Sequence, residues 1–293
     1  SAAAEVKNIR RIVSPVLAYI KGTYLYYIDF SFDTFKLGGS AFAQTLGKVG
    51  DEVPTVTDAE YFKNAFAAVQ ELTSRGLILA GHDISSGGMI TAMLEMCFAN
   101  PQGGLEAHLD KIRHADLIKI LFSENPGVLI QVKHHQLVEK ILNDYGLGFA
   151  IIARPIEERK LIIAKEEFRQ EFDIDHLRDV WYKTSYLLDR KQSGEKCAAD
   201  RFANYKQQPL QFYIKPSFTG KMEDLGLNPD RKERSGLTAA IIREKGTNGE
   251  REMAYALYLA GFDVKDVHMT DLTSGRETLE DVQFAVFCGG FSN

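Results

Sequence analysis

The fold is decided by a strand–turn–helix unit at residues 77–98, which reads LILAGHDISSGGMITAMLEMCF. The short apolar run Leu77–Ala80 is typical of a buried strand. Met89–Phe98 is apolar on nearly every side, which predicts a buried helix. Between them lies the turn Gly81–Gly88, which carries an aspartate, a histidine, hydroxyls and glycines. This unit predicts a domain in which strands and helices alternate closely.

Similar segments lie on both sides of this unit. Further strands and helices are expected at residues 23–30, 58–75, 128–132, 137–146 and 149–153. The first of these is aromatic and β-branched, as strands are. The second has apolar residues at helical spacing, with Asp58 available as its N-cap and Gly76 as its C-terminal stop. We therefore expect an α/β or α+β domain over residues 1–164.

Length, composition and net charge argue against several functional classes. The chain has 293 residues, 45% of them hydrophobic, and a formal net charge of −5. At roughly 150 residues per domain this length predicts two domains. The acidic balance argues against binding to nucleic acid or to an anionic membrane surface. No apolar run approaches the roughly 18 residues that a membrane span needs, and the N-terminus lacks the pattern of a signal peptide.

Three cysteines, Cys97, Cys197 and Cys288, lie far apart in the sequence and form no CxxC pair. Neither a disulfide framework nor a zinc site is supported by this spacing. Reduced thiols are the better interpretation, and they predict a cytoplasmic protein.

The C-terminal part of the chain differs from the first domain. Residues 165–235 are richly charged and predict a partly helical connector. Residues 236–293 return to alternation, with strands expected at 237–242, 263–269 and 283–288 and a helix at 250–260. Two crossovers between these strands predict a parallel, flavodoxin-like sheet. Three strands make half of such a domain, and the chain does not open with methionine, so we expect a segment of a longer protein.

The turn Gly81–Gly88 is the strongest candidate site. It lies between a strand end and a helix start, where backbone N–H groups and the helix dipole favour phosphate. Asp83 could hold Mg²⁺, and Ser85 could contact a phosphate or the metal, because magnesium commonly uses one or two carboxylates plus phosphate oxygens. The alternative is that Asp83 and Ser85 only cap the helix. Residue types and spacing leave both open.

Other polar motifs give weaker signals. Glu124 lies in the turn Ser123–Gly127, whose Asn-Pro-Gly sequence is ordinary turn chemistry. His134 and His135 begin a helix with no further metal ligand at suitable spacing. His82 is best explained as a packed or hydrogen-bonded residue, and Cys288 as a small buried residue at a strand end.

Five ordered motifs carry a family resemblance. They are Leu37-Gly-Gly-Ser-Ala-x-Ala-Gln44, Gly50-Asp-Glu-x-Pro54, Gly81–Ala99, Leu121-Phe-Ser-Glu-x-Pro-Gly127 and the glutaminase-like pair Gly246–Ala254 and Val286–Ser292. A further segment, Leu177-Arg-x-x-Trp-x-x-Thr-Ser-Tyr186, lies between the fourth motif and the glutaminase-like pair. It resembles the connector that joins these two regions. In this order the motifs resemble the large, glutamine-dependent phosphoribosylformylglycinamidine synthases of purine biosynthesis, and the resemblance extends over essentially the whole chain.

The resemblance implies a fold and an activity. Residues 1–164 are similar to the C-terminal subdomain of the second AIR-synthetase-like half, an α+β domain. Residues 165–235 are similar to the connector, and residues 236–293 to the incomplete start of a flavodoxin-like class I glutamine amidotransferase domain. Members of the family convert formylglycinamide ribonucleotide, ATP and glutamine to formylglycinamidine ribonucleotide, ADP, phosphate and glutamate, with the remaining domains of the same enzyme as partners of such a segment.

The resemblance also implies roles for residues. Asp83 matches a family aspartate that binds Mg²⁺ and nucleotide, and Ser85 a serine of the same site. Of the family's two related ATP/ADP sites we favour the structural one over the catalytic one. Gly290 resembles the oxyanion-hole glycine of the glutaminase, whose nucleophilic cysteine falls beyond residue 293. We therefore expect this chain alone to be catalytically inactive; the alternative is a stand-alone nucleotide-binding or scaffolding module.

Overall fold

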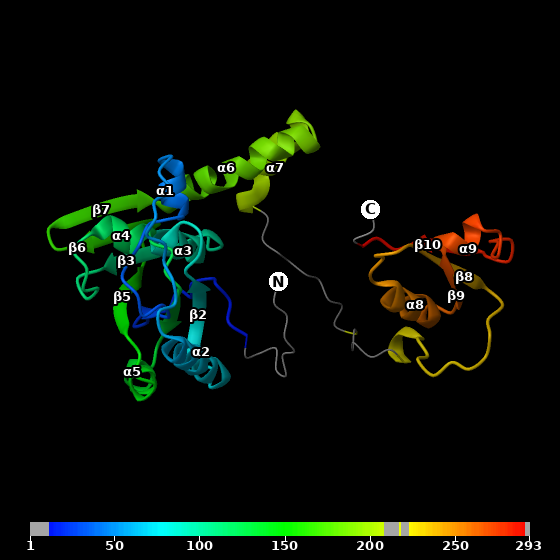
Figure 1. The fold of residues 1–293 in the computed structure, drawn as a ribbon, viewed down its shortest axis with the longest axis horizontal. Helices are drawn as coiled ribbons and strands as arrows, with labels where there is room; N and C mark the ends of the chain where they lie inside the picture. The colour runs from blue at the N-terminus through cyan, green and yellow to red at the C-terminus, as the bar shows by residue number, and fades with distance from the viewer. Residues whose placement is uncertain (1–11, 208–216, 218–222, 291–293) are drawn as a thin grey trace. The chain divides into compact units, whose positions relative to one another are not determined.

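The structure is a computed structural model that describes residues 12–207, 217 and 223–290. The chain divides between positions 209 and 210 into two compact units. Figure 1 draws both units. No helix among the described residues is long and apolar enough to cross a membrane.

The first unit is built on a seven-stranded sheet with the order β2-β4-β1-β5-β3-β6-β7. Its strands are β1 (Tyr24–Asp29), β2 (Ile78–Asp83), β3 (Gly104–His108), β4 (Gly127–Val132), β5 (Phe149–Ile156), β6 (Lys160–Lys165) and β7 (Phe168–Asp173). Strands β3 and β6 pair in parallel, and the other neighbouring pairs are antiparallel. The sheet is therefore mixed, and β2, which ends at Asp83, is one of its edges.

Helices cover both faces of this sheet. They are α1 (Ala41–Thr45), α2 (Ala59–Ser74), α3 (Gly88–Phe98), α4 (Leu117–Phe122), α5 (His135–Asp144), α6 (Ile174–Gln192) and α7 (Glu195–Asn204), with a 3-10 turn at Tyr205–Gln207. Alternate residues of a strand point to opposite faces. Accordingly Leu25 and Tyr27 of β1 join the core around α3, whereas Tyr26 and Ile28 join the core under α2 and α5.

Most elements expected in the first unit are present. Helix α2 begins at the predicted N-cap, because the Asp58 carboxylate accepts hydrogen bonds from two N–H groups of the first turn. Helix α3 is apolar on nearly every side, as predicted, and is buried along most of its length. The mixed α/β class is confirmed.

The segment expected to be a partly helical connector also contains a strand that the sequence did not predict. Strand β7 pairs with β6 along the sheet edge, where the Lys160 ammonium lies 2.7 Å from the Glu171 carboxylate. Its side chains are almost all exposed, so an edge strand of this kind lacks the apolar alternation by which strands are recognised. Helices α6 and α7 also fall within the first unit. The division at residues 164 and 235 stays a prediction.

The second unit contains a three-stranded parallel sheet. Its strands are β8 (Thr238–Arg243), β9 (Asp263–His268) and β10 (Phe284–Phe287), in the order β10-β8-β9. The helices of this unit are α8 (Glu250–Leu259) and α9 (Met269–Thr273), and a 3-10 turn covers Glu223–Leu225. Small buried cores lie on the two faces of β8, around Ile241 and Ile242. The predicted parallel sheet is confirmed.

The cysteines should differ sharply in reactivity. Burial raises the pKa of the Cys97 thiol on α3 to about 12, although Arg159 acts in the opposite direction. Cys197 on α7 is exposed. Because the thiolate is the reactive form, we expect iodoacetamide at pH 8 to label Cys197 and to leave Cys97 unlabelled until the chain is unfolded. Mass spectrometry of the alkylated peptides measures this, and rapid native labelling of Cys97 would contradict the buried position.

Candidate functional site

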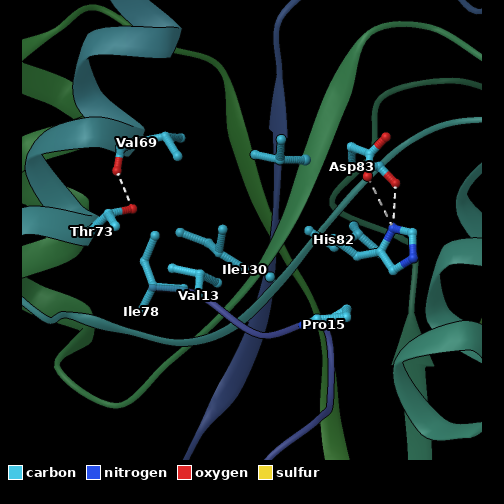
Figure 2. Close-up of a pocket in the computed structure, with 11 residues that line it drawn as sticks. Val13, Pro15, Val69, Thr73, Ile78, His82, Asp83 and Ile130 are labelled. Carbon is cyan, nitrogen blue, oxygen red and sulfur yellow. Dashed lines mark hydrogen bonds and ion pairs between the residues drawn. The ribbon is translucent and has the colours of Figure 1, made fainter. Parts of the chain in front are cut away.

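The candidate site lies where strand β2 ends and helix α3 begins. Asp83 is the last residue of β2, and it pairs with Val128 of β4. The Ile84 N–H donates to the Gly127 carbonyl at 2.8 Å, and the Gly88 N–H donates to the Ser85 carbonyl at 2.9 Å. These backbone bonds hold the turn rigidly between the sheet and the helix. Figure 2 shows Asp83 and His82 at one end of a cavity of about 330 Å³ that is otherwise lined mainly by apolar side chains.

Asp83 and Ser85 do not cap helix α3. The N-cap residue is Gly87, with φ +91°, and no side chain accepts a capping hydrogen bond from within the helix start. The Asp83 side chain is 75% exposed, and Ser85 is exposed as well. The capping alternative for these two residues is therefore wrong, and their polar atoms face solvent.

Glu124 fills the position that the sequence suggested for a ligand. Its Oε1 atom accepts a hydrogen bond from the Gly87 N–H at 2.9 Å and a second from the Ala41 N–H at 2.7 Å. One carboxylate oxygen thus joins the starts of α3 and α1, where the helix dipoles favour negative charge. The sequence favoured a structural role for Glu124 over a functional one; these contacts are structural, although the sequence did not predict the two N–H groups. The only sequence signal for it was an acidic residue inside an otherwise neutral turn.

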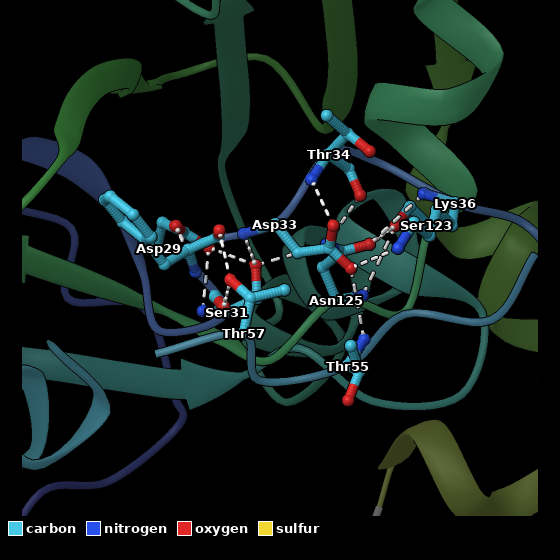
Figure 3. Close-up of polar contacts among 10 residues, drawn as sticks. Asp29, Ser31, Asp33, Thr34, Lys36, Thr55, Thr57, Ser123 and Asn125 are labelled. Carbon is cyan, nitrogen blue, oxygen red and sulfur yellow. Dashed lines mark hydrogen bonds and ion pairs between the residues drawn. The ribbon is translucent and has the colours of Figure 1, made fainter. Parts of the chain in front are cut away.

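A second polar network holds the turn that carries Glu124 (Figure 3). The Asn125 side chain donates from Nδ2 to the Ser31 hydroxyl at 3.2 Å and to the Thr34 carbonyl at 3.0 Å. The Asp29 carboxylate in turn accepts from the N–H and hydroxyl of Ser31. These contacts tie the end of β1 to the start of β4. They fix the backbone from which Glu124 reaches both helix starts.

Asp33 lies in the loop that follows β1, and its side chain is held in the ionised carboxylate form. Its Oδ2 lies 2.6 Å from the Lys36 ammonium and accepts from the Thr55 N–H, and its Oδ1 accepts from the Thr34 N–H. Burial by itself would raise the pKa of Asp33, but these donors outweigh it and lower the pKa below its usual range. The Asp33 carboxylate therefore stays ionised near neutral pH.

His82 and Glu95 are paired beside Asp83. The His82 Nε2 atom lies 3.1 Å from Oε2 of Glu95 on α3, and Nδ1 lies 2.7 Å from the Asp83 carbonyl oxygen. The interpretation of His82 as a hydrogen-bonded residue agrees with these contacts. Glu95 was not predicted, although it is the one charged residue in the apolar run Met89–Phe98.

The expected glutaminase motif forms a compact turn in the second unit. The Asn248 N–H donates to the Gly289 carbonyl at 3.0 Å, and Thr247 forms an isolated bridge with Gly290. A Cβ atom at Gly290 would lie 2.5 Å from the Gly246 carbonyl oxygen. Only glycine fits this approach of the two loops. The rest of that motif, residues 291–293, lies outside the described residues.

Among the residues that the structure describes, no group of three or more His, Cys, Asp or Glu side chains is arranged to hold a metal ion. Any cation at Asp83 would need most of its ligands from elsewhere, such as phosphate oxygens and water.

Two domain families match the chain. Residues 33–165 match the AIR synthase related protein C-terminal domain, and residues 237–293 match the CobB/CobQ-like glutamine amidotransferase domain. The first match contains Asp83, Ser85 and Glu124, and the second contains Gly290.

Curated relatives match over most or all of the chain. It is 33% identical over 300 residues to the Homo sapiens phosphoribosylformylglycinamidine synthase, covering 100% of this chain and 22% of that protein. It is 34% identical over 278 residues to a probable chloroplastic/mitochondrial phosphoribosylformylglycinamidine synthase of Arabidopsis thaliana, covering 92% of this chain and 19% of that protein. The chain thus spans about a fifth of the length of these relatives.

A solved structure described as T. maritima PurL complexed with FGAR is also similar. The identity is 20%, the TM-score is 0.47, and the match covers 58% of this chain and 30% of that one.

Proposed function

The chain belongs to the phosphoribosylformylglycinamidine synthase family, and on that premise we propose that it forms part of an ATP-dependent C–N ligase. The reaction combines formylglycinamide ribonucleotide, ATP and the amide nitrogen of glutamine. The products are formylglycinamidine ribonucleotide, ADP, phosphate and glutamate. The other domains of the same enzyme are the partners of this segment, in the cytoplasm, with no nucleic acid or membrane partner.

Within that ligase, we assign a nucleotide-binding role to the turn after β2. The observation that supports it is the exposure of Asp83 and Ser85 at the end of β2, where neither side chain caps α3. An exposed side chain at the end of an ordered strand is available for a ligand. We propose that Asp83 binds Mg²⁺ and that Ser85 contacts an ATP or ADP phosphate, in the family's structural nucleotide site.

The donor chemistry at Asp83 fits magnesium. Magnesium prefers oxygen ligands and is usually held by one or two carboxylates together with phosphate oxygens and water. Asp83 supplies one exposed carboxylate, and the described residues supply no complete cage. When bound, Mg²⁺ would neutralise phosphate charge. Asp83 would then orient the metal–nucleotide complex at the exposed end of β2, because Glu124 already occupies the start of α3.

In the second unit we propose that Gly290 supplies an oxyanion-hole N–H for glutamine hydrolysis. Support comes from the close packing of Gly290 against the 246–249 turn, which fixes its peptide plane. Such preorganised donors stabilise the tetrahedral intermediate of acyl transfer.

The role of Asp83 can be tested with Asp83→Asn. We expect about tenfold weaker binding of Mg-ADP, because the amide keeps the shape of aspartate but loses the charge that the metal needs. Binding of ADP without magnesium should change little. Calorimetry on the complete enzyme that carries this segment, with and without the metal, measures both affinities.

Asp58→Asn is the matched control, because Asp58 is a true N-cap and asparagine caps a helix about as well as aspartate does. That variant should bind Mg-ADP normally. Unchanged Mg-ADP affinity in Asp83→Asn would rule out the ligand role. Binding of Mg-ADP at micromolar concentration by the 293-residue chain alone would instead favour the stand-alone nucleotide-binding module.

A further inference from the structure

Glu95 connects the Asp83 turn to helix α6. Its Oε2 atom faces Nε2 of His82 at 3.1 Å, and its Oε1 atom accepts a hydrogen bond from the Trp181 indole N–H at 3.0 Å. Both oxygens of this one carboxylate are therefore used, by partners from two different elements. His82 belongs to β2, and Trp181 belongs to α6.

His82 in turn restrains Asp83 directly. Its Nδ1 atom lies 2.7 Å from the Asp83 carbonyl oxygen and 3.5 Å from Oδ1 of the same residue (Figure 2). The His82 side chain is only 15% exposed and Glu95 is 26% exposed, whereas Asp83 is 75% exposed. The side chains of His82 and Glu95 are thus largely covered, whereas the Asp83 side chain beside them faces solvent.

Helix α6 is fixed to the far end of α3 by further contacts. Arg178 of α6 donates to the Phe98 carbonyl of α3 at 2.8 Å, and the Asp175 carboxylate of the same helix α6 lies 2.9 Å from Arg178. The rings of Trp181 and Phe98 are 5.6 Å apart. Helix α6 therefore presents the Trp181 N–H to Glu95 at a fixed position.

We propose that Glu95 and His82 are positioning residues that hold Asp83 in the geometry for Mg-nucleotide, and that Trp181 couples this pair to helix α6. The proposal rests on the proposed role of Asp83. Partners behind a metal ligand commonly fix its orientation, and their loss typically costs 10- to 100-fold in metal affinity. The chain Trp181–Glu95–His82–Asp83 has this arrangement.

The test uses Glu95→Gln and Trp181→Phe in the complete enzyme. His82 and Trp181 contact different oxygens of Glu95, and glutamine replaces one of these two oxygens with an NH2 group, so it cannot accept at both positions. We expect about tenfold weaker Mg-ADP binding for Glu95→Gln. Trp181→Phe keeps the ring contact with Phe98 and removes only the N–H, so we expect a smaller loss of about threefold.

The affinity for ADP, measured with and without magnesium, distinguishes a positioning role from a general loss of structure. Only the magnesium-dependent part should fall in Glu95→Gln, with an unchanged melting temperature. Glu139→Gln is the matched control, because Glu139 on α5 also accepts from an aromatic donor, the Tyr26 hydroxyl at 2.8 Å, but contacts neither His82 nor Asp83.

The outcomes distinguish the two proposals. If Asp83→Asn weakens Mg-ADP binding and Glu95→Gln does not, the positioning role is wrong and the metal-ligand role stands. If neither variant weakens it, the ligand role itself is wrong. Equal losses with and without magnesium in Glu95→Gln would show a purely structural effect and would overturn the positioning role.

Discussion

Gly88→Ala should destabilise the first unit by about 3–5 kcal/mol, the size of effect seen when a substitution forces backbone apart in a core. Gly88 has φ +73°, a left-handed conformation that costs other residues energy. More important, a Cβ atom there would lie 2.6 Å from the Leu121 carbonyl oxygen and 2.7 Å from the Phe122 carbonyl carbon. These neighbours are backbone atoms, so no side chain can rotate away.

Gly146→Ala is the control that isolates the backbone conformation. Gly146 has nearly the same φ, +70°, but nothing lies within 4 Å of a Cβ built on it. Only the left-handed strain of about 1–2 kcal/mol should appear there. Urea unfolding of both variants measures the difference. Equal losses for the two would mean that the end of α4 does not pack against Gly88 as the structure has it.

The sequence predicted those helices and strands whose apolar pattern and capping residues lie within one short segment. Helix α2 carries its own N-cap in Asp58, and strand β1 alternates between two cores, so each signal lies within one short segment. Strand β6 was missed although it has the same six-residue length as β1, and β7 was missed because its side chains are almost all exposed along a solvated edge. The apolar pattern within one segment does not indicate that an exposed strand pairs with a neighbouring strand.

The candidate site was predicted only in part, for a related reason. Asp83 and Ser85 are neighbours in sequence and lie at a strand end, so their placement follows from the strand–turn–helix pattern. Glu124 acts on N–H groups 37 and 83 positions away in sequence. Glu95 depends on His82 and Trp181, which β2 and α6 bring to it. Such contacts follow from the tertiary fold.

Glu124→Ala should cost about 3 kcal/mol, because two hydrogen bonds to a charged acceptor are lost together, at about 1.5 kcal/mol or more each. The N–H groups of Gly87 and Ala41 are half-buried and would lose their common partner. Glu124→Gln keeps an acceptor oxygen at the same place and loses only the charge, so its cost should be about 1 kcal/mol. Chemical denaturation of the three proteins measures this order.

Asp58→Ala is a demanding control for Glu124, because Asp58 Oδ1 also accepts from two backbone N–H groups, those of Glu60 and Tyr61. That cap is local and exposed, so water replaces it and the expected cost is about 1 kcal/mol. Glu124 instead joins two segments distant in sequence, and its loss should also loosen the turn that presents Asp83. We therefore expect Glu124→Ala to weaken Mg-ADP binding as well as stability, whereas Asp58→Ala should affect stability alone. If both variants lose similar stability and keep normal nucleotide affinity, Glu124 is an ordinary cap and does not shape the site.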